Sequence, residues 1–142
     1  MKTVAVVLAR VGSKRLPGKT MYPLDGDTTI GRVIQRLSSA STIDQAILAT
    51  SEETCDDVLA MEARDAGIEV YRGSETDVLG RTRRAAEQLD ADTIVRVAGD
   101  CPLVSPEIVD HCVSKLRETG ADYASNKLDR TFPLGFDVEA FT

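Results

Sequence analysis

The sequence predicts a single α/β domain over residues 1–142, with three layers and a mainly parallel sheet. Short apolar runs alternate with longer helical patterns four times along the chain, and repeated strand–helix units place their strands in parallel through right-handed crossovers. The first run, Lys2–Ala9, is apolar without a break from Val4 onward, as in a strand buried on both faces. A hydrophobic content of 42% in 142 residues is enough for one ordinary core.

The helices are predicted from apolar spacing and from residues typical of helix ends. Apolar side chains recur three and four positions apart, which places them on one helical face. Gly67 and Gly120 suit the left-handed position that follows a helix, and Ser105 followed by Pro106 suits a helix start. The four predicted helices are Thr29–Ala40, Cys55–Ala66, Asp77–Leu89 and Ser105–Gly120.

The remaining apolar runs predict the other strands, and a long polar loop separates the first strand from about Asp27. In sheets of this class, ligands bind beyond the carboxyl ends of the strands. The loops that follow Lys2–Ala9 and Thr93–Ala98 are therefore the expected ligand-binding segments. After the first strand, the predicted strands are Gln45–Thr50, Ile68–Tyr71, Thr93–Ala98, Asp122–Ser125 and Phe136–Phe141.

Charge and composition exclude several classes of partner. The net charge of −6 and the pI near 4.8 argue against a general nucleic-acid or anionic membrane surface, which needs a basic face. The apolar runs are far shorter than the roughly 20 residues of a membrane helix, and no signal sequence is evident. Three cysteines without a CxxC pair fit a reducing compartment. We therefore expect a cytoplasmic protein.

The loop after the first strand is basic in an otherwise acidic protein. No acidic residue occurs between Met1 and Leu24. Gly12 and Gly18 allow the backbone to approach an anion, and Pro17 stiffens the turn. Cationic side chains neutralise phosphate charge, so the loop predicts a polyphosphate site rather than a merely solvated surface. The loop cations are Arg10, Lys14, Arg15 and Lys19.

Two familiar phosphate-binding motifs do not fit this loop. A Rossmann fingerprint needs G-x-G-x-x-G at the start of a helix, and a P-loop needs G-x-x-x-x-G-K-S/T. The segment from Gly12 to Gly18 has one residue too many between its glycines, and Pro23 and Gly26 disfavour a helix from Thr20. A P-loop-like phosphotransferase therefore stays a less favoured alternative.

Asp100 follows the predicted strand Thr93–Ala98 and places one carboxylate at the expected crevice. Mg²⁺ commonly takes one or two protein carboxylates together with phosphate oxygens. A loop aspartate can equally accept hydrogen bonds from nearby backbone amides, so both roles are open for Asp100. The adjacent Cys101 has no histidine or asparagine partner in the local sequence, and we interpret it as a packing residue.

Four ordered segments resemble the cytidylyltransferases that make CMP-activated acidic sugars, particularly the branch called spore coat polysaccharide biosynthesis protein F-like. The resemblance extends over nearly the whole chain, and two of the segments coincide with the basic loop and with Asp100. The segments are Ala9–Lys19, Arg72–Arg81, Val97–Leu103 and Asn126–Glu139.

The resemblance implies the Rossmann-like nucleotide-binding half of a glycosyltransferase-A-like fold and transfer of CMP from CTP to a sugar, with release of pyrophosphate. It implies catalytic roles for Arg10, Lys19 and Asp100, with Asp100 as the Mg²⁺ ligand. The sugar would meet Arg130, Asp137 and Glu139. The residues that the resemblance assigns to the nucleotide are Leu8, Ala9, Arg10, Gly12, Ser13, Arg15, Lys19, Ser74, Asp77 and Arg81.

The resemblance also bears on completeness and assembly. Related enzymes continue beyond the position of Thr142, so we expect this chain to lack the C-terminal part of the family fold. A truncated, non-catalytic nucleotide-binding module that acts with a partner is therefore the main alternative to an enzyme. Members of the family often dimerise, and the segment Phe132–Phe141 is the candidate contact for a homodimer.

Overall fold

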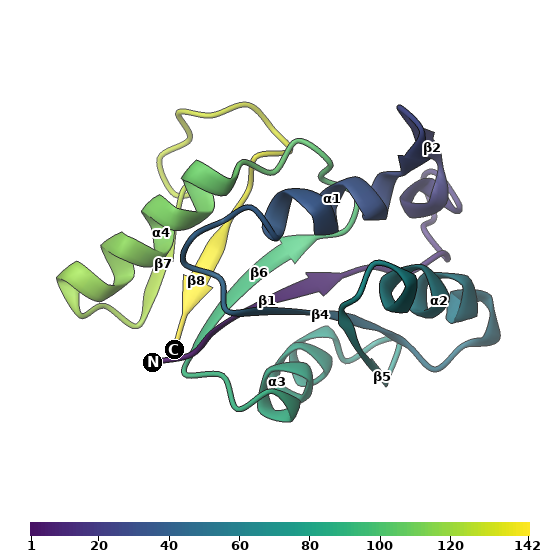
Figure 1. Ribbon diagram of the computed structural model, residues 1–142, viewed down its shortest axis with the longest axis horizontal. Coiled ribbons are helices and arrows are strands. Elements are labelled where there is room, and N and C mark those ends of the chain that lie inside the picture. The colour runs from purple at the N-terminus through teal and green to yellow at the C-terminus, as the bar shows by residue number, and fades with distance from the viewer.

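The computed structural model describes residues 1–142 (Figure 1). Six strands form its central sheet, in the order β5-β4-β1-β6-β8-β7. β1 pairs in parallel with β4 and β6, and β4 pairs in parallel with β5, whereas β8 runs antiparallel to β6 and β7. The sheet is therefore mainly parallel, as predicted, with an antiparallel edge. The strands are β1 (Thr3–Leu8), β4 (Gln45–Ser51), β5 (Glu69–Gly73), β6 (Thr93–Ala98), β7 (Tyr123–Ser125) and β8 (Glu139–Phe141), and a separate hairpin contains β2 (Pro23–Leu24) and β3 (Asp27–Thr28).

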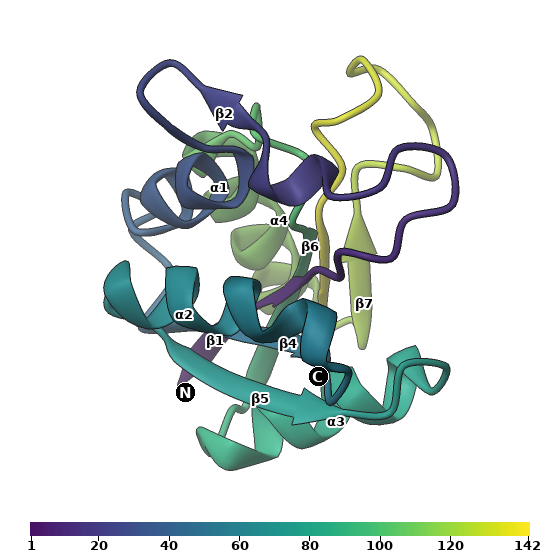
Figure 2. The ribbon, with the colours of Figure 1, turned by 90° about the vertical axis from the view of Figure 1, so that its right-hand side faces the viewer.

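Helices cover both faces of this sheet and complete the three predicted layers. One core cluster joins α1, α2 and α4 to the sheet, and a second joins α3 to the opposite face (Figures 1 and 2). No helix in the structure has the length and apolar character that a membrane span requires. The α-helices are α1 (Thr29–Leu37), α2 (Asp57–Asp65), α3 (Val78–Gln88) and α4 (Pro106–Thr119), with 3-10 turns η1 (Lys19–Met21) and η2 (Thr54–Asp56).

β1 is buried on both faces, as its unbroken apolar sequence predicts. Val4 and Val6 pack in the cluster with α3, whereas Ala5 and Val7 pack in the larger cluster on the other face. All four side chains are fully buried, because successive side chains of a strand point to opposite faces. This central strand fixes the position of the loop that follows it.

Most predicted helix ends are confirmed. Gly67 and Gly120 have φ angles of 81° and 64°, and the Ser105 hydroxyl accepts the Ile108 N–H at 3.4 Å. The helix from Thr29 stops at Leu37, three residues earlier than predicted.

The start of α2 and the first long loop differ from the prediction. Cys55 lies in η2 rather than in α2. Asp56 precedes α2, but its side chain makes no capping bond there and accepts a hydrogen bond from Val11 instead. The loop before α1 contains η1 and the β2–β3 hairpin, which periodicity could not reveal because each element has only two or three residues.

Candidate functional site

The carboxyl ends of β1 and β6 lie against each other at the point where the strand order reverses. The Gly99 N–H donates to the Leu8 carbonyl at 2.8 Å. A Cβ atom at Gly99 would lie 2.8 Å from the Cβ atom of Ala9, which is too close for any side chain. The absence of a side chain at Gly99 therefore lets the loops that carry Ala9 and Asp100 share one crevice, the usual ligand position in such sheets.

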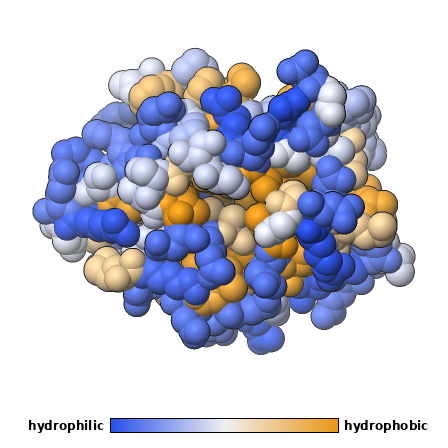
Figure 3. Space-filling view, viewed as in Figure 1, coloured by the Kyte–Doolittle hydropathy of each residue, from blue (hydrophilic) through white to orange (hydrophobic).

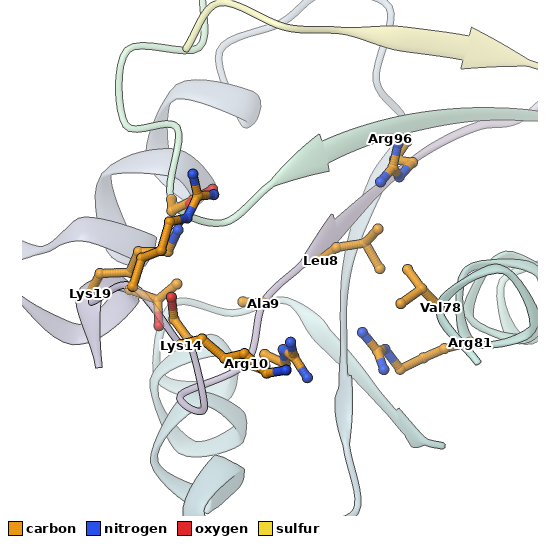
Figure 4. A pocket seen from close by; sticks show the side chains of 12 residues that line it. Leu8, Ala9, Arg10, Lys14, Lys19, Val78, Arg81 and Arg96 are labelled. Atoms are coloured by element: carbon orange, nitrogen blue, oxygen red, sulfur yellow. The ribbon is translucent and has the colours of Figure 1, made fainter. Parts of the chain in front are cut away.

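A cavity of about 360 Å³ opens at this crevice (Figure 4). Six of its twelve lining residues are arginine or lysine, and one is acidic, although the whole chain carries a net charge of −6. Hydrophilic residues cover most of the molecular face shown in Figure 3. The cavity differs from the chain as a whole in the sign of its charge. The lining residues are Leu8, Ala9, Arg10, Ser13, Lys14, Arg15, Lys19, Thr20, Val78, Arg81, Arg96 and Asp100.

The basic loop is closed on itself by backbone hydrogen bonds. The Val11 carbonyl accepts from the Ser13 N–H at 2.7 Å and from the Gly18 N–H at 2.9 Å. Gly18 has a φ angle of 72°, a left-handed conformation that favours glycine. The loop then turns into η1, so that Lys19 points back to the cavity. Gly12 has neither a left-handed φ angle nor a crowded Cβ position.

Lys19 and Asp100 meet in the cavity. The Lys19 Nζ atom forms an ion pair with Asp100, and both side chains are about one-third exposed, at 28% and 32%. The pair joins the loop after β1 to the loop after β6. Both charged groups remain accessible to a ligand that enters the cavity.

Arg81 is a nearly buried cation on the α3 side of the cavity. It is only 4% exposed, and burial lowers the pKa of its guanidinium from the usual value. Its Nη1 atom donates to the carbonyls of Ser74 and Glu75 at 2.6 and 3.1 Å, whereas its buried Nε–H has no partner. Figure 4 shows Arg81 and Arg10 reaching toward each other, and Arg10 also pairs with Glu75 at 2.9 Å.

Ser74 and Asp77 build the turn between β5 and α3 rather than the main cavity. The Asp77 carboxylate accepts the Gly80 N–H at 2.8 Å and caps α3. The Ser74 hydroxyl accepts the Asp77 N–H at 3.1 Å. These two residues line a neighbouring cavity of about 260 Å³, which shares Arg81 with the main one.

Arg96 extends the cavity toward β8. It pairs with Glu139, which also forms an ion pair with Lys127 at 2.8 Å. Partial burial alone would raise the pKa of Glu139, but hydrogen bonds from Lys127 and Arg96 outweigh it and lower the pKa from the ordinary value. Arg130 and Asp137 form a separate pair at 2.7 Å, in which the guanidinium lowers the pKa of the carboxyl group.

The structure brings together eight of the residues assigned from sequence at the main cavity. Six others do not line it, namely Gly12, Ser74, Asp77, Arg130, Asp137 and Glu139. The cavity residues that the site assignment omitted are Lys14, Thr20, Val78 and Arg96. Arg96 could have been found as the one charged residue in the apolar run before Asp100, and Lys14 from its place in the basic loop.

The surroundings of Cys101, beside Asp100, disfavour its thiolate form. Burial and the adjacent carboxylate raise the pKa of its thiol to about 11. Because the thiolate is the reactive form of cysteine, the side chain is protonated at neutral pH. The interpretation of Cys101 as a packing residue agrees with this environment.

Residues 4–133 match the family described as cytidylyltransferase. The chain belongs to this family. Among its curated relatives, the spore coat polysaccharide biosynthesis protein SpsF of Bacillus subtilis is 34% identical over 122 residues, which covers 83% of the chain and 51% of the relative. The 3-deoxy-manno-octulosonate cytidylyltransferase of Geotalea daltonii is 34% identical over 118 residues, covering 83% and 46%. The chain thus spans about half the length of the curated relatives it matches.

Solved structures share the fold. A cytidylyltransferase from Leptospira borgpetersenii is 38% identical with a TM-score of 0.95, and the match covers all of this chain and 60% of that one. A CMP:2-keto-3-deoxy-manno-octonic acid synthetase solved with CTP has a TM-score of 0.76 at 22% identity, covering 88% and 52%. A Mycobacterium tuberculosis protein solved with manganese has a TM-score of 0.60 at 23% identity, covering 87% and 62%.

Proposed function

We propose that the main cavity binds the triphosphate of CTP and that the chain provides this site for cytidylyl transfer to a sugar. In the proposed reaction, a sugar hydroxyl attacks the α-phosphorus of CTP, the new phosphorus–oxygen bond forms, and pyrophosphate leaves. The observation that carries the proposal is the set of six cations around one cavity in an acidic chain that belongs to the cytidylyltransferase family.

Arg10 and Lys19 are the proposed phosphate ligands. They lie before and after the closed loop, and both side chains line the cavity. Charge-assisted hydrogen bonds from such groups neutralise phosphate oxygens and hold them in line for attack. Ser13 and Arg15 add donors on the same loop, while the backbone at Leu8, Ala9 and Gly12 would follow the nucleotide.

Asp100 is the proposed ligand of a divalent cation. Its carboxylate faces the cavity and is 32% exposed, which fits a hard oxygen ligand at a site where phosphates supply further oxygens. No group of three or more His, Cys, Asp or Glu side chains is placed to hold a metal ion. Mg²⁺ bound there would neutralise developing phosphate charge. Lys19, which contacts Asp100 in this structure, would then be free to donate to phosphate.

The base and the sugar are assigned to opposite sides of the cavity. Ser74, Asp77 and Arg81 frame the neighbouring hollow beside α3, and we propose that the base or ribose approaches there. Arg130, Asp137 and Glu139 are the proposed sugar-side residues. The proposed substrate is an acidic or other sugar used in cell-surface or spore-coat polysaccharide. We propose a cytoplasmic enzyme. Of the segment Phe132–Phe141, Val138 and Ala140 are fully buried and β8 is paired on both sides, so the proposed homodimer contact is limited to the exposed residues 132–134.

Nucleotide-dependent thermal stability tests the proposed specificity. A ligand that binds only the folded state raises the unfolding temperature, so CTP with Mg²⁺ should raise it more than ATP or GTP does at equal concentration. Inorganic triphosphate with Mg²⁺ is the matched probe without a base. An equal response to all three nucleotides would reject cytosine selectivity, and no response to any would reject the site.

A nucleotide-binding module that acts with further protein segments is the second candidate. It is supported by the coverage of about half the length of the relatives. Pyrophosphate release from CTP and a panel of sugars, acidic ones included, separates the two candidates. Turnover by the 142-residue chain would reject the module, whereas CTP binding without turnover would support it.

A further inference from the structure

The basic loop depends on one buried carboxylate that lies outside it. Asp56 belongs to η2, which follows β4, and it is 1% exposed. Its Oδ1 atom accepts the Val11 N–H at 2.7 Å. Its Oδ2 atom accepts the Ser51 N–H at 3.3 Å and is also hydrogen-bonded to the Ser51 hydroxyl. Asp56 thus ties the start of the loop to the end of β4.

Val11 is the residue at which the loop closes. Its N–H is held by Asp56, and its carbonyl accepts from both Ser13 and Gly18. Its side chain packs against the larger core cluster. Arg10 lies one residue before Val11, and Lys19 follows directly after Gly18. A single contact therefore constrains both flanks of the loop.

We infer that Asp56 is a positioning residue for the phosphate site, an inference that rests on the proposed function. Asp56 does not line the cavity, so it touches neither phosphate nor the reacting atoms. It acts by holding Val11, and through Val11 it fixes where Arg10 and Lys19 present their charges. A preorganised site of this kind binds more tightly because its ligand groups need no ordering on binding.

The amino end of β1 offers a matched control. There the Asp44 Oδ2 atom accepts the Thr3 N–H at 2.7 Å, the same kind of bond as between Asp56 and Val11. Asp44 is far from the cavity lining, because Thr3 and Leu8 are the two ends of the strand. Asp44→Asn and Asp56→Asn therefore weaken the same kind of carboxylate–amide bond at opposite ends of β1. Asp44 is exposed and accepts this one bond, whereas Asp56 is buried and also accepts from Ser51.

The test combines amide hydrogen exchange with calorimetry, well below the unfolding temperature, using CTP and inorganic triphosphate as probes. For Asp56→Asn we expect faster exchange of the Val11 and Gly18 amides and about tenfold weaker binding of both probes. For Asp44→Asn we expect faster exchange at Thr3, with the dissociation constants within about twofold of wild type. Ser51→Ala, which removes one donor to Asp56, should weaken binding by a smaller factor and replaces Asp56→Asn if that variant does not fold.

Unchanged affinity in the Asp56 and Ser51 variants would overturn the inference, as would an equal loss of affinity in Asp44→Asn. The two probes distinguish a failure of the inference about Asp56 from a failure of the proposed nucleotide binding. If the wild-type protein binds inorganic triphosphate but shows no preference for CTP, the nucleotide proposal fails while the role of Asp56 is still measured. If neither probe binds the wild type, both proposals are overturned.

Discussion

The two ends of β1 use carboxylates in the same way but differ in the charges around them. At the amino end, Asp92 and Asp44 accept the N–H groups of Lys2 and Thr3 at 2.6 and 2.7 Å. At the carboxyl end, Asp56 accepts the Val11 N–H at 2.7 Å. These bonds complete the backbone pairing at each end of the buried strand.

Only the carboxyl end has an excess of positive charge. Six cationic side chains line the cavity there, with Asp100 as the one acidic residue. Gathering like charges costs free energy unless anions compensate them. Three of the six cations are paired within the protein, Arg10 with Glu75, Lys19 with Asp100 and Arg96 with Glu139. We propose that a phosphate ligand compensates the remaining excess of positive charge.

Removal of a cavity cation should give the largest effect. Lys19→Ala should weaken binding of CTP with Mg²⁺ by about 10- to 100-fold, because a charged hydrogen bond contributes about 1.5–3 kcal/mol. Arg10→Ala should act in the same direction, and titration calorimetry measures both. Lys115→Ala is the matched control, since Lys115 pairs only with Glu118 on the exposed side of α4. If Lys19→Ala and Arg10→Ala both bound as tightly as wild type, the loop would not be the phosphate site.

Substitution of the glycine at the crevice should give the next largest effect. Gly99→Ala would place a Cβ atom 2.8 Å from the Ala9 Cβ and 3.2 Å from the Leu8 carbonyl oxygen. Forced overpacking of this kind costs about 1–3 kcal/mol, which urea denaturation would record as a lower free energy of unfolding. Gly12→Ala should change the free energy of unfolding little, because its nearest contact would be 3.8 Å away. Equal stability of the two variants would contradict the close approach of β1 and β6.

Loss of the Glu139 ion pairs should give the smallest change in the free energy of unfolding, and this change should depend on pH. The pKa of Glu139 is lowered in the folded protein, so its contribution is complete above the unfolded value of about 4.3 and is lost as pH falls through the lower folded value. Glu139→Gln should reduce the free energy of unfolding at pH 7 by about 0.5–1 kcal/mol, because Arg96 and Lys127 are 42% and 36% exposed and solvent screens both pairs. The difference from wild type should shrink as the pH falls below about 4. Urea titrations at both pH values would measure it, and a difference that grew in acid would refute the assignment.

Much of the fold could be predicted because its signals are local. The buried β1 and the face of α1 follow from runs and spacings of apolar residues, and Gly67, Ser105 and Gly120 mark helix ends by their own backbone preferences. The antiparallel edge could not be predicted in this way. β8 has only three residues, and its direction is set by pairing with β6 and β7 rather than by its composition.

Site residues could be predicted only where they lie close together in the sequence. The loop cations and Asp100 are visible because they are clustered and follow strands. Arg96 was omitted because it lies within a strand, and its contact with Glu139 joins residues 43 positions apart. Asp56 gives no sequence signal either, since its bond to Val11 spans 45 positions. Long-range contacts of this kind depend on the assembled sheet.

A structure of the chain with CTP and Mg²⁺ tests the central claim most directly. The account predicts the triphosphate in the cavity between β1 and β6, with Arg10 and Lys19 on phosphate oxygens and the cation on Asp100. The contact between Lys19 and Asp100 should be replaced by contacts to the ligand. A nucleotide bound elsewhere, with the Lys19–Asp100 contact intact and no phosphate on the basic loop, would contradict it.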